Sequence, residues 1–309
     1  MSDLQFLKEA RLDGRVEWGV PMAALTTLRV GGPAEAVVFA GSEADVRLVV
    51  RLCRENGAEL TIFGRGSNLL VRDGGLRGVA LCLGREFAQM RRAGAEILAQ
   101  AGAALPALSR AARDAGLSGL EFAEGIPGSV GGAVAMNAGA YGGEIAQVLR
   151  SARVLFPDGE VREVENAGLD FSYRSSALQR EGLVCLGARF SLQAGDAAEI
   201  SARMADFAGR RREKQPLQLP SAGSFFKRPP GDYAGRLIEE AGLKGAREGG
   251  AQVSPQHAGF FVNAGGATAG DFLALMERVQ RAVYERSGVR LEPEVRILGQ
   301  DAAGEGGRQ

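Results

Sequence analysis

Residues 124–143 read EGIPGSVGGAVAMNAGAYGG, and this stretch decides the fold because its composition fits neither a plain helix nor a plain strand. Its glycines alternate with small apolar residues, which leaves backbone N–H groups uncovered and lets the chain approach another group closely. Pro127 can set a turn that leads into a short helix through Ala133 to Met136, where the helix N-terminus favours an anion. The stretch is therefore interpreted as a phosphate cradle made of backbone. The alternative is a tight helix-on-sheet packing site, which needs glycine only for closeness.

A second glycine-rich turn lies at residues 62–71, IFGRGSNLLV, between two short apolar runs. It is not the dinucleotide fingerprint, which needs a third glycine where Leu69 stands and a helix directly afterwards. It is not a P-loop either, because no Gly-Lys-Ser/Thr follows. Two separate glycine loops with small polar residues suit a diphosphate that is held from both sides.

Composition and charge limit the classes of function. The chain has 309 residues, of which 45% are hydrophobic and 24% charged, as in an ordinary soluble globular protein. Lys+Arg 37 against Asp+Glu 37 gives a net charge of zero, so no global field attracts nucleic acid or an anionic membrane. The start of the chain lacks a basic region followed by an apolar one, and no run reaches the length of a membrane span. We expect a cytoplasmic protein that binds neither nucleic acid nor a membrane.

Cysteine and histidine usage argues against a metal site or a disulfide. Cys53, Cys82 and Cys185 are widely spaced among apolar neighbours, which is typical of buried thiols. His257 is the only histidine, so zinc-type ligation has few ligands, and we predict no metal. The sequence favours His257 as a packed, hydrogen-bonded residue.

The order of the predicted elements indicates an α+β fold. A capping box at Ser42–Asp45 starts a helix that Gly57 ends, and strands at 36–40 and 60–63 flank it to form a βαβ-like unit. A Pro-Asp-Gly turn at 157–159 joins two strands as a hairpin. Further strands are predicted at 79–83, 97–101, 184–192, 260–263 and 295–298, and further helices at 5–11, 105–115, 196–214, 233–241 and 268–287.

Three short motifs can carry chemistry. In FSYRSS, residues 171–176, Arg174 could present a planar bidentate donor to a carboxylate, or it could be a surface arginine paired with a nearby acid. In PSAGSFFKRP, residues 220–229, Ser224 is either a proton donor or a turn residue. In LEPEVR, residues 291–296, Glu294 stands at the mouth of a strand, where glutamates are usually solvated.

The two glycine loops and the three motifs, taken in order, resemble the UDP-N-acetylenolpyruvoylglucosamine reductases, the MurB family of peptidoglycan synthesis. GRGSNLLV followed by GIPGSVGGAVAMNAGAYGGEI is similar to the flavin-binding half of that family, and the similarity extends over roughly residues 26–299. The short separation of Arg174 from Ser224 leaves little room for the extra substrate-covering loop of one subgroup. The chain therefore resembles the shorter, type II-like subgroup. Tyr141 and Tyr233 of this chain are candidates for closing over the substrate.

The resemblance implies a two-lobed FAD-binding domain of the PCMH/vanillyl-alcohol-oxidase type, followed by a C-terminal α+β substrate-binding domain. The implied boundaries are an N-terminal arm at 1–24, the FAD-binding domain in two subdomains at 25–195, the substrate-binding domain at 196–300 and a flexible tail at 301–309. FAD should be bound non-covalently, because His257 lies in the second lobe and no cysteine falls within either glycine loop.

The resemblance also implies the reaction. It is the NADPH-dependent reduction of UDP-N-acetylglucosamine enolpyruvate to UDP-N-acetylmuramate through FAD, a cytoplasmic step of peptidoglycan precursor synthesis, with NADPH and the sugar nucleotide taking turns. Ser224 corresponds to the proton donor, and Arg174 and Glu294 correspond to the residues that stabilise the intermediate. An enolate needs donors aimed at its developing charge, which Arg174 and a protonated Glu294 can supply.

The cofactor and substrate residues follow from the same motifs. The residues expected to bind FAD are Gly64, Arg65, Gly66, Ser67, Asn68 and Leu69 in one loop, and Gly125, Pro127, Gly128, Ser129, Gly131, Gly132, Asn137 and Gly139 in the other. The residues expected to bind substrate are Tyr173, Lys227, Arg228 and Arg236, of which Arg228 stands where some family members have asparagine. Among the other basic residues nearby, some are expected to be solvated, Arg211 or Arg212 for example.

Two alternatives stay open from the sequence. Another FAD-dependent oxidoreductase of the same binding fold, such as an oxidase of a hydroxy acid or sugar, would share the glycine loops but would not need Ser224, Arg174 and Glu294. A non-catalytic nucleotide-binding module would be colourless and would not oxidise NADPH. In each case the expected partners are small molecules, with no obligate protein partner.

Overall fold

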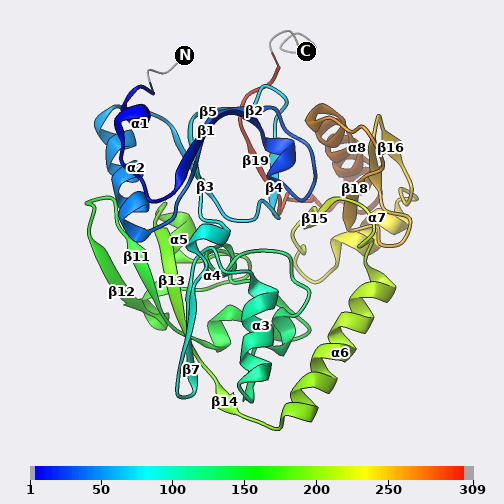
Figure 1. The fold of residues 1–309 in the computed structure, drawn as a ribbon. Helices are drawn as coiled ribbons and strands as arrows, with labels where there is room; N and C mark the ends of the chain where they lie inside the picture. The colour runs from blue at the N-terminus through cyan, green and yellow to red at the C-terminus, as the bar shows by residue number, and fades with distance from the viewer. Residues whose placement is uncertain (1–3, 303–309) are drawn as a thin grey trace. The chain divides into compact units, whose positions relative to one another are not determined.

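The computed structural model describes residues 4–302 and divides into two compact units (Figure 1). The first unit comprises the chain up to Glu17, then Ala36–Arg65 and Gly78–Arg210. The second unit comprises Trp18–Glu35, Gly66–Arg77 and the chain from Arg211 onward. Both units mix helices and strands, as the sequence predicts.

A four-stranded sheet in the order β1-β2-β5-β3 begins the fold, and the unit boundary cuts through three of its strands. Helix α2 follows β2 and is capped by Ser42, whose Oγ accepts a hydrogen bond from the backbone N–H of Asp45 at 3.2 Å. Its buried side chains, Val46, Val49 and Cys53, join the core under the strands. The predicted βαβ-like unit is therefore confirmed. The elements are α1 (Phe6–Glu9), β1 (Arg15–Pro21), β2 (Pro33–Phe39), α2 (Glu43–Glu55), β3 (Leu60–Phe63) and β5 (Leu76–Cys82).

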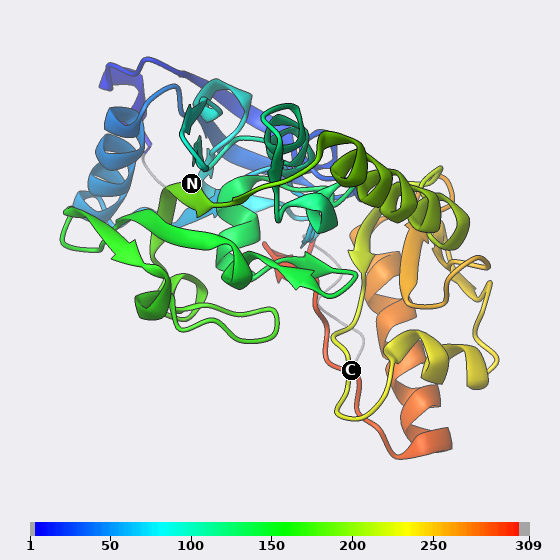
Figure 2. The same ribbon diagram turned by 90° about the horizontal axis from the view of Figure 1, so that it is seen from below.

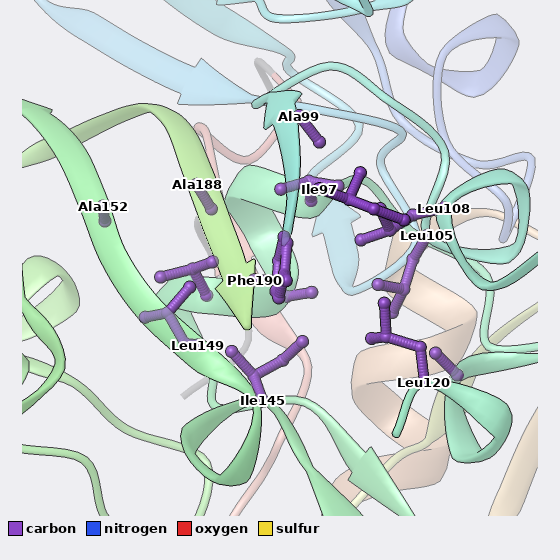
Figure 3. Packing of buried hydrophobic residues seen from close by; sticks show 14 of the residues in the cluster. Ile97, Ala99, Leu105, Leu108, Leu120, Ile145, Leu149, Ala152, Ala188 and Phe190 are labelled. Carbon is purple, nitrogen blue, oxygen red and sulfur yellow. The ribbon is translucent and has the colours of Figure 1, made fainter. Parts of the chain in front are cut away.

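A five-stranded antiparallel sheet in the order β12-β11-β13-β7-β6 forms the rest of the first unit's frame. The buried face of this sheet packs against α3 and α4. Figure 3 shows Phe190 between Leu149 and the α3 residues Leu105 and Leu108. Phe190 is fully buried there. The predicted hairpin is confirmed by the β11–β12 pairing. The elements are β6 (Met90–Ala93), β7 (Glu96–Gln100), α3 (Leu105–Asp114), α4 (Val130–Ala135), β11 (Leu149–Leu155), β12 (Val161–Glu165) and β13 (Val184–Ser191).

Short elements complete the first unit. Two two-stranded sheets pair β8 with β14 and β9 with β10. The long helix α6 begins in this unit, and its last residues belong to the second. The elements are β8 (Leu117–Ser118), β9 (Gly139–Ala140), β10 (Gly143–Glu144), α5 (Ala177–Arg180), β14 (Gln193–Ala194) and α6 (Ala197–Lys214).

The second unit is built on a sheet in the order β15-β18-β17-β16, which helix α8 packs against (Figures 1 and 2). Phe225 and Phe261 stack at 4.3 Å between ring centroids, and Phe272 of α8 closes the same core. The helix has the predicted ends, with a capping box at Thr268 and a left-handed C-cap at Gly288. The elements are β4 (Leu69–Val71), β15 (Ser221–Ser224), α7 (Ala234–Glu240), β16 (Arg247–Glu248), β17 (Ala251–Val253), β18 (Phe260–Asn263), α8 (Ala269–Ser287) and β19 (Arg296–Leu298).

The division into units differs from the domain boundaries predicted from the sequence. Residues 15–21, predicted to lie in an N-terminal arm, form strand β1 of the first sheet. The compact units part at Arg210–Arg211 within α6, rather than near residue 196. The predicted tail at 301–309 falls largely outside the described residues.

The three cysteines are buried free thiols, which confirms that part of the sequence analysis. Burial raises the pKa of Cys53 to about 11 and the pKa values of Cys82 and Cys185 to about 12. Thiols held in this way are poor nucleophiles. Between residues 4 and 302, no helix is both long enough and apolar enough to cross a membrane.

Asp45 fixes the start of α2 to the chain that precedes the first sheet. Only 2% of the residue is exposed. Its carboxylate accepts hydrogen bonds from the backbone N–H groups of Asp13 at 2.9 Å, Gly14 at 2.9 Å and Gly41 at 2.8 Å. A buried carboxylate with three such donors stabilises the fold through charge-assisted hydrogen bonds.

The substitution Asp45→Asn should lower the free energy of unfolding by about 2 kcal/mol, because an amide nitrogen cannot accept and leaves a buried N–H unpaired. Urea titration followed by circular dichroism would measure the change. Glu55→Gln, which alters an exposed carboxylate on the same helix, is the control and should shift stability by less than about 0.5 kcal/mol. Equal unfolding midpoints for the two variants would contradict the assigned role of Asp45.

Candidate active site

The two glycine loops meet within the first unit. Gly64 follows strand β3, and Ser129 is the N-cap of helix α4. A Cβ atom built on Gly64 would lie 2.1 Å from Ser129 Oγ and 3.0 Å from Ser129 Cβ. A larger residue at position 64 would therefore force the Ser129 side chain to move.

The longer glycine loop is pinned to the end of strand β7. The backbone N–H of Gly131 donates to Ala101 O at 2.8 Å, and that of Val130 donates to Ala103 O at 2.8 Å. A Cβ on Gly131 would lie 2.8 Å from Ala101 Cβ. Gly131 thus serves the close packing that was the alternative interpretation of this stretch. Gly125 and Gly128 have positive φ values of 76° and 154°, so the turn around Pro127 depends on glycine as well.

The second half of the shorter loop belongs to the second unit, whose boundary falls between Arg65 and Gly66. Gly66 is buried with a φ of 61°, and a Cβ there would lie 2.2 Å from Leu25 O. Asn68 Nδ2 donates to the carbonyl of Glu294 at 3.0 Å, and the Arg296 N–H donates to Asn68 O at 3.0 Å. Asn68 and Leu69 therefore join β4 to β19, while Ser67 is partly exposed beside them.

Arg174 lies in a tight turn in the first unit. Its φ is 55°, in the left-handed region that residues other than glycine rarely adopt. Its Nη2 donates to Gly139 O at 3.3 Å, and its guanidinium lies 5.2 Å from the ring centroid of the exposed Tyr173. Asn137, buried with a φ of 42°, and Gly139 follow α4 directly. The structure thus brings Arg174 beside the end of the longer glycine loop.

Ser224 and Glu294 lie on adjoining segments of the second unit. Ser224 is exposed and ends strand β15, opposite Phe260. The Glu294 N–H donates to Phe225 O at 2.9 Å, and Phe226 pairs with Pro293. Main-chain pairing therefore holds the segment that carries the carboxylate beside the segment that carries the hydroxyl.

The predicted substrate-binding cations of the second unit lie among acids and aromatic rings. Lys227 Nζ lies 3.3 Å from Glu292 Oε2, and the Arg228 guanidinium lies 4.5 Å from the Tyr233 ring centroid. Arg236 forms ion pairs with Asp232 and Glu240 of its own helical segment, and these hydrogen bonds raise the pKa of its guanidinium. A substrate diphosphate would compete with those carboxylates for Arg236.

The two arginines at the basic helix end differ in exposure. Arg211 is 6% exposed and buried at the end of α6. Arg212, the next residue, is exposed, so of the two it is the one that fits the expectation of a solvated helix end. A helix surface alternates with a period of 3.6 residues, so two adjacent arginines can face opposite environments.

Glu121 is a buried residue that sequence reasoning missed. Its carboxylate accepts from Ser118 Oγ at 2.8 Å, from the Gly119 N–H at 2.7 Å and from Arg203 Nη2 at 2.8 Å. Burial raises the pKa of this carboxyl, but the hydrogen bonds of Arg203 and of the backbone outweigh it, and the net pKa is lowered. The carboxylate secures the chain just before the longer glycine loop. The Ser118-x-x-Glu121 spacing of a capping box was the available signal.

His257 is packed and hydrogen-bonded, as the sequence predicts. Its Nδ1 accepts from the Gly259 N–H at 3.1 Å, and its ring meets Phe260 edge-on at 5.0 Å. Burial lowers the pKa of the imidazole. The neutral ring therefore serves the second unit's fold.

Comparisons with known proteins match two parts of the chain to family models. The family model described as the FAD binding domain matches residues 34–165, and the one described as the C-terminal domain of UDP-N-acetylenolpyruvoylglucosamine reductase matches residues 215–298. The predicted fold class, an FAD-binding domain followed by an α+β C-terminal domain, is confirmed.

Individual relatives match over nearly the whole chain. The UDP-N-acetylenolpyruvoylglucosamine reductase of Pediococcus pentosaceus is 50% identical over 281 residues, 91% of this chain and 93% of that protein. The Geobacillus kaustophilus protein of the same name is 47% identical over 281 residues, 91% of this chain and 92% of that protein. The crystal structure of the Thermus caldophilus reductase superposes with a TM-score of 0.80 at 40% identity, covering 92% of this chain and 99% of that one.

The substitution Gly64→Ala should weaken FAD binding by roughly tenfold, about 1.4 kcal/mol, because the new methyl group would push the two loops apart. Removing the opposing side chain with Ser129→Gly in the same protein should recover most of the loss. Flavin release followed by fluorescence would measure both effects.

The control for Gly64→Ala is Gly209→Ala in helix α6. A Cβ there meets nothing within 4 Å, and alanine is the better helix former. This variant should keep its FAD. Unchanged affinity in folded Gly64→Ala protein would show that the loops need no such closeness.

Proposed function

The chain belongs to the UDP-N-acetylenolpyruvoylglucosamine reductase family, and from this membership we propose which of its residues carry the chemistry. The protein is an FAD-containing, NADPH-dependent oxidoreductase that reduces UDP-N-acetylglucosamine enolpyruvate to UDP-N-acetylmuramate, a step of peptidoglycan precursor synthesis. The observation that carries this conclusion is 50% identity to a reductase over 91% of the chain. Ser224 is proposed as the proton donor, and Arg174 and Glu294 as the groups that stabilise negative charge on the substrate.

The glycine loops are proposed to hold FAD through their backbone. Gly64 and Ser129 meet with no side chain larger than a serine hydroxymethyl between the loops, and glycine-rich backbone of this kind suits a cofactor diphosphate. When bound, FAD passes hydride from NADPH to the substrate. The attachment is proposed to be non-covalent, because Cys53, Cys82 and Cys185 are buried thiols and the His257 imidazole is bonded within the second unit.

Arg174 is suited to the developing charge of the substrate. Hydride addition to the terminal carbon of the enolpyruvyl group leaves negative charge on the adjacent carbon and its carboxylate. A guanidinium stays protonated throughout the physiological range and presents paired N–H donors in a plane that matches a carboxylate. Glu294, in its protonated form, can donate a further hydrogen bond to the same oxygens.

Ser224 is proposed to complete the reduction by giving its hydroxyl proton to the carbon that carries the charge. Its side chain is exposed at the end of β15, so a substrate can reach it. The serine oxygen then regains a proton from water or from a neighbouring group. A positioned proton donor of this kind contributes about 10²- to 10⁴-fold to a rate.

The basic side chains of the second unit are proposed to bind the sugar nucleotide, and Tyr173 is proposed as a further substrate-binding residue. Lys227 and Arg236 are exposed and carry charges that suit a diphosphate, and Arg228 adds a third cation. We further propose that the protein works in the cytoplasm on small molecules, without nucleic acid, a membrane or an obligate protein partner. Its free thiols fit a reducing compartment, and its net charge of zero gives no attraction to polyanions.

An anaerobic visible spectrum tests the reaction and its order. Flavin absorbance should bleach when NADPH is added and return when UDP-N-acetylglucosamine enolpyruvate follows, because both molecules exchange hydride through the same cofactor. A flavin that NADPH bleaches but the enolpyruvyl compound leaves reduced would indicate another flavoenzyme activity. A folded protein that takes up no FAD would overturn both.

The substitution Ser224→Ala should leave flavin reduction by NADPH within about twofold of wild type and slow reoxidation by the enolpyruvyl substrate at least about 100-fold, because only the second half-reaction needs the proton. Stopped-flow absorbance would measure each half-reaction. Ser221→Ala, which removes a hydroxyl from the same strand, is the control and should leave both rates intact. Equal losses in the two half-reactions would mean that Ser224 is structural.

A further inference from the structure

The turn that carries Arg174 is closed by two backbone hydrogen bonds between its ends, and its backbone is strained at Arg174. The N–H of Ser172 donates to Ser175 O at 3.1 Å, and the N–H of Ser175 donates to Ser172 O at 3.2 Å. Tyr173 and Arg174 therefore form its two-residue tip. Because Arg174 has a φ of 55°, the turn needs support from outside to keep this conformation.

Arg180 of α5 donates to Ser175 Oγ at 3.1 Å, and three further contacts join the turn to the segment 135–139 at the end of α4. Asn137 Nδ2 donates to Ser172 O at 3.3 Å, and the buried Ser176 Oγ donates to Ala135 O at 2.7 Å. Arg174 Nη2 donates to Gly139 O at 3.3 Å. The end of the longer glycine stretch thus holds the turn before its tip, after its tip and at the guanidinium itself.

Asn137 meets three demands at once. Its own φ is 42°, a region in which asparagine is among the few residues tolerated. Its Oδ1 accepts from the Ala146 N–H at 3.0 Å while its Nδ2 donates to the Ser172 carbonyl. A backbone N–H can only donate and a carbonyl can only accept, so the partners fix the amide in this one orientation. The residue is 2% exposed, which keeps water from replacing either bond.

We propose that Asn137 is a positioning residue that holds the Tyr173–Arg174 turn in the conformation from which Arg174 meets the substrate. The inference rests on the proposed role of Arg174 and extends it to a residue that the sequence suggested only for FAD binding. Asn137 acts on substrate chemistry through the turn, with its side chain committed to the protein. It therefore links the flavin-binding stretch to the group that stabilises the substrate's charge.

The substitution Asn137→Asp isolates this link. A carboxylate keeps the acceptor for the Ala146 N–H and loses the donor to Ser172 O. Reoxidation of reduced enzyme by the enolpyruvyl substrate should slow by about tenfold to a hundredfold, the cost of misplacing a group that must be aligned. Flavin reduction by NADPH, measured in protein saturated with FAD, should stay within about twofold of wild type. Similar slowing of both half-reactions would overturn the proposal.

Asn166→Asp is the matched control. Asn166 Nδ2 donates to Ala146 O at 2.8 Å and Leu149 O at 2.7 Å, so this change also removes an amide donor from the segment that Asn137 contacts. It touches neither Ser172 nor Ser175. Slowed substrate reoxidation in this control, equal to that of Asn137→Asp, would show a general effect of the segment and contradict the proposal.

A double-mutant cycle with Arg174→Ala separates this proposal from the proposed function. If Asn137 works through Arg174, Asn137→Asp should slow reoxidation less than about twofold further in the Arg174→Ala background. Multiplied effects would overturn the positioning role. If Arg174→Ala alone leaves reoxidation unchanged, the proposed function of Arg174 fails first. If Arg174→Ala slows it and Asn137→Asp does not, only the present inference fails.

Asn137→Gly provides a second route if the aspartate variant does not fold. Glycine accepts the left-handed φ without strain and lacks both side-chain bonds. The same selective loss of substrate reoxidation is expected in folded, FAD-loaded protein. Wild-type reoxidation by this variant would overturn the proposal.

Discussion

The close approach of Gly64 and Ser129 is the constraint on which the first unit depends. A Cβ on Gly64 would overlap Ser129 Oγ, so the turn after β3 and the N-cap side chain of α4 can lie this close because residue 64 has no side chain. One loop follows strand β3 and the other leads into helix α4, so their contact joins two segments that are distant in the sequence.

The longer glycine stretch, residues 124–143, is closely packed in its first half and supports a strained turn with its second half. Its first half packs against the end of β7 through Gly131, and its second half supports Arg174 through Asn137 and Gly139. A non-glycine residue in the left-handed region costs of order 1–3 kcal/mol and persists only where its surroundings over-determine it. Three hydrogen bonds with the segment 135–139 and one from Arg180 provide such surroundings, which explains how the turn can keep Arg174 in an unfavourable backbone conformation.

The sequence predicts well what local chemistry determines. Strands β3 and β18 have the predicted bounds, and α8 has the predicted capping box and glycine stop, because each signal lies within the element. Strands β4 and β6 were not predicted. Each has three or four residues, and β4 pairs with Arg296–Leu298, far away in sequence. The family's motifs predicted Ser224, Arg174 and Glu294 by type and order. The bond from Asn137 to Ser172 spans 35 residues without a local pattern, so only the structure reveals it.

Charge pairing bears on the proposed substrate-binding role of the second unit's cations. Arg236 is bonded to Asp232 and Glu240, and Lys227 lies beside Glu292, so these cations already have carboxylate partners. Exposed ion pairs of this kind are weak, so a substrate diphosphate, which offers several oxygens at once, would be able to compete with the carboxylates for the same cations.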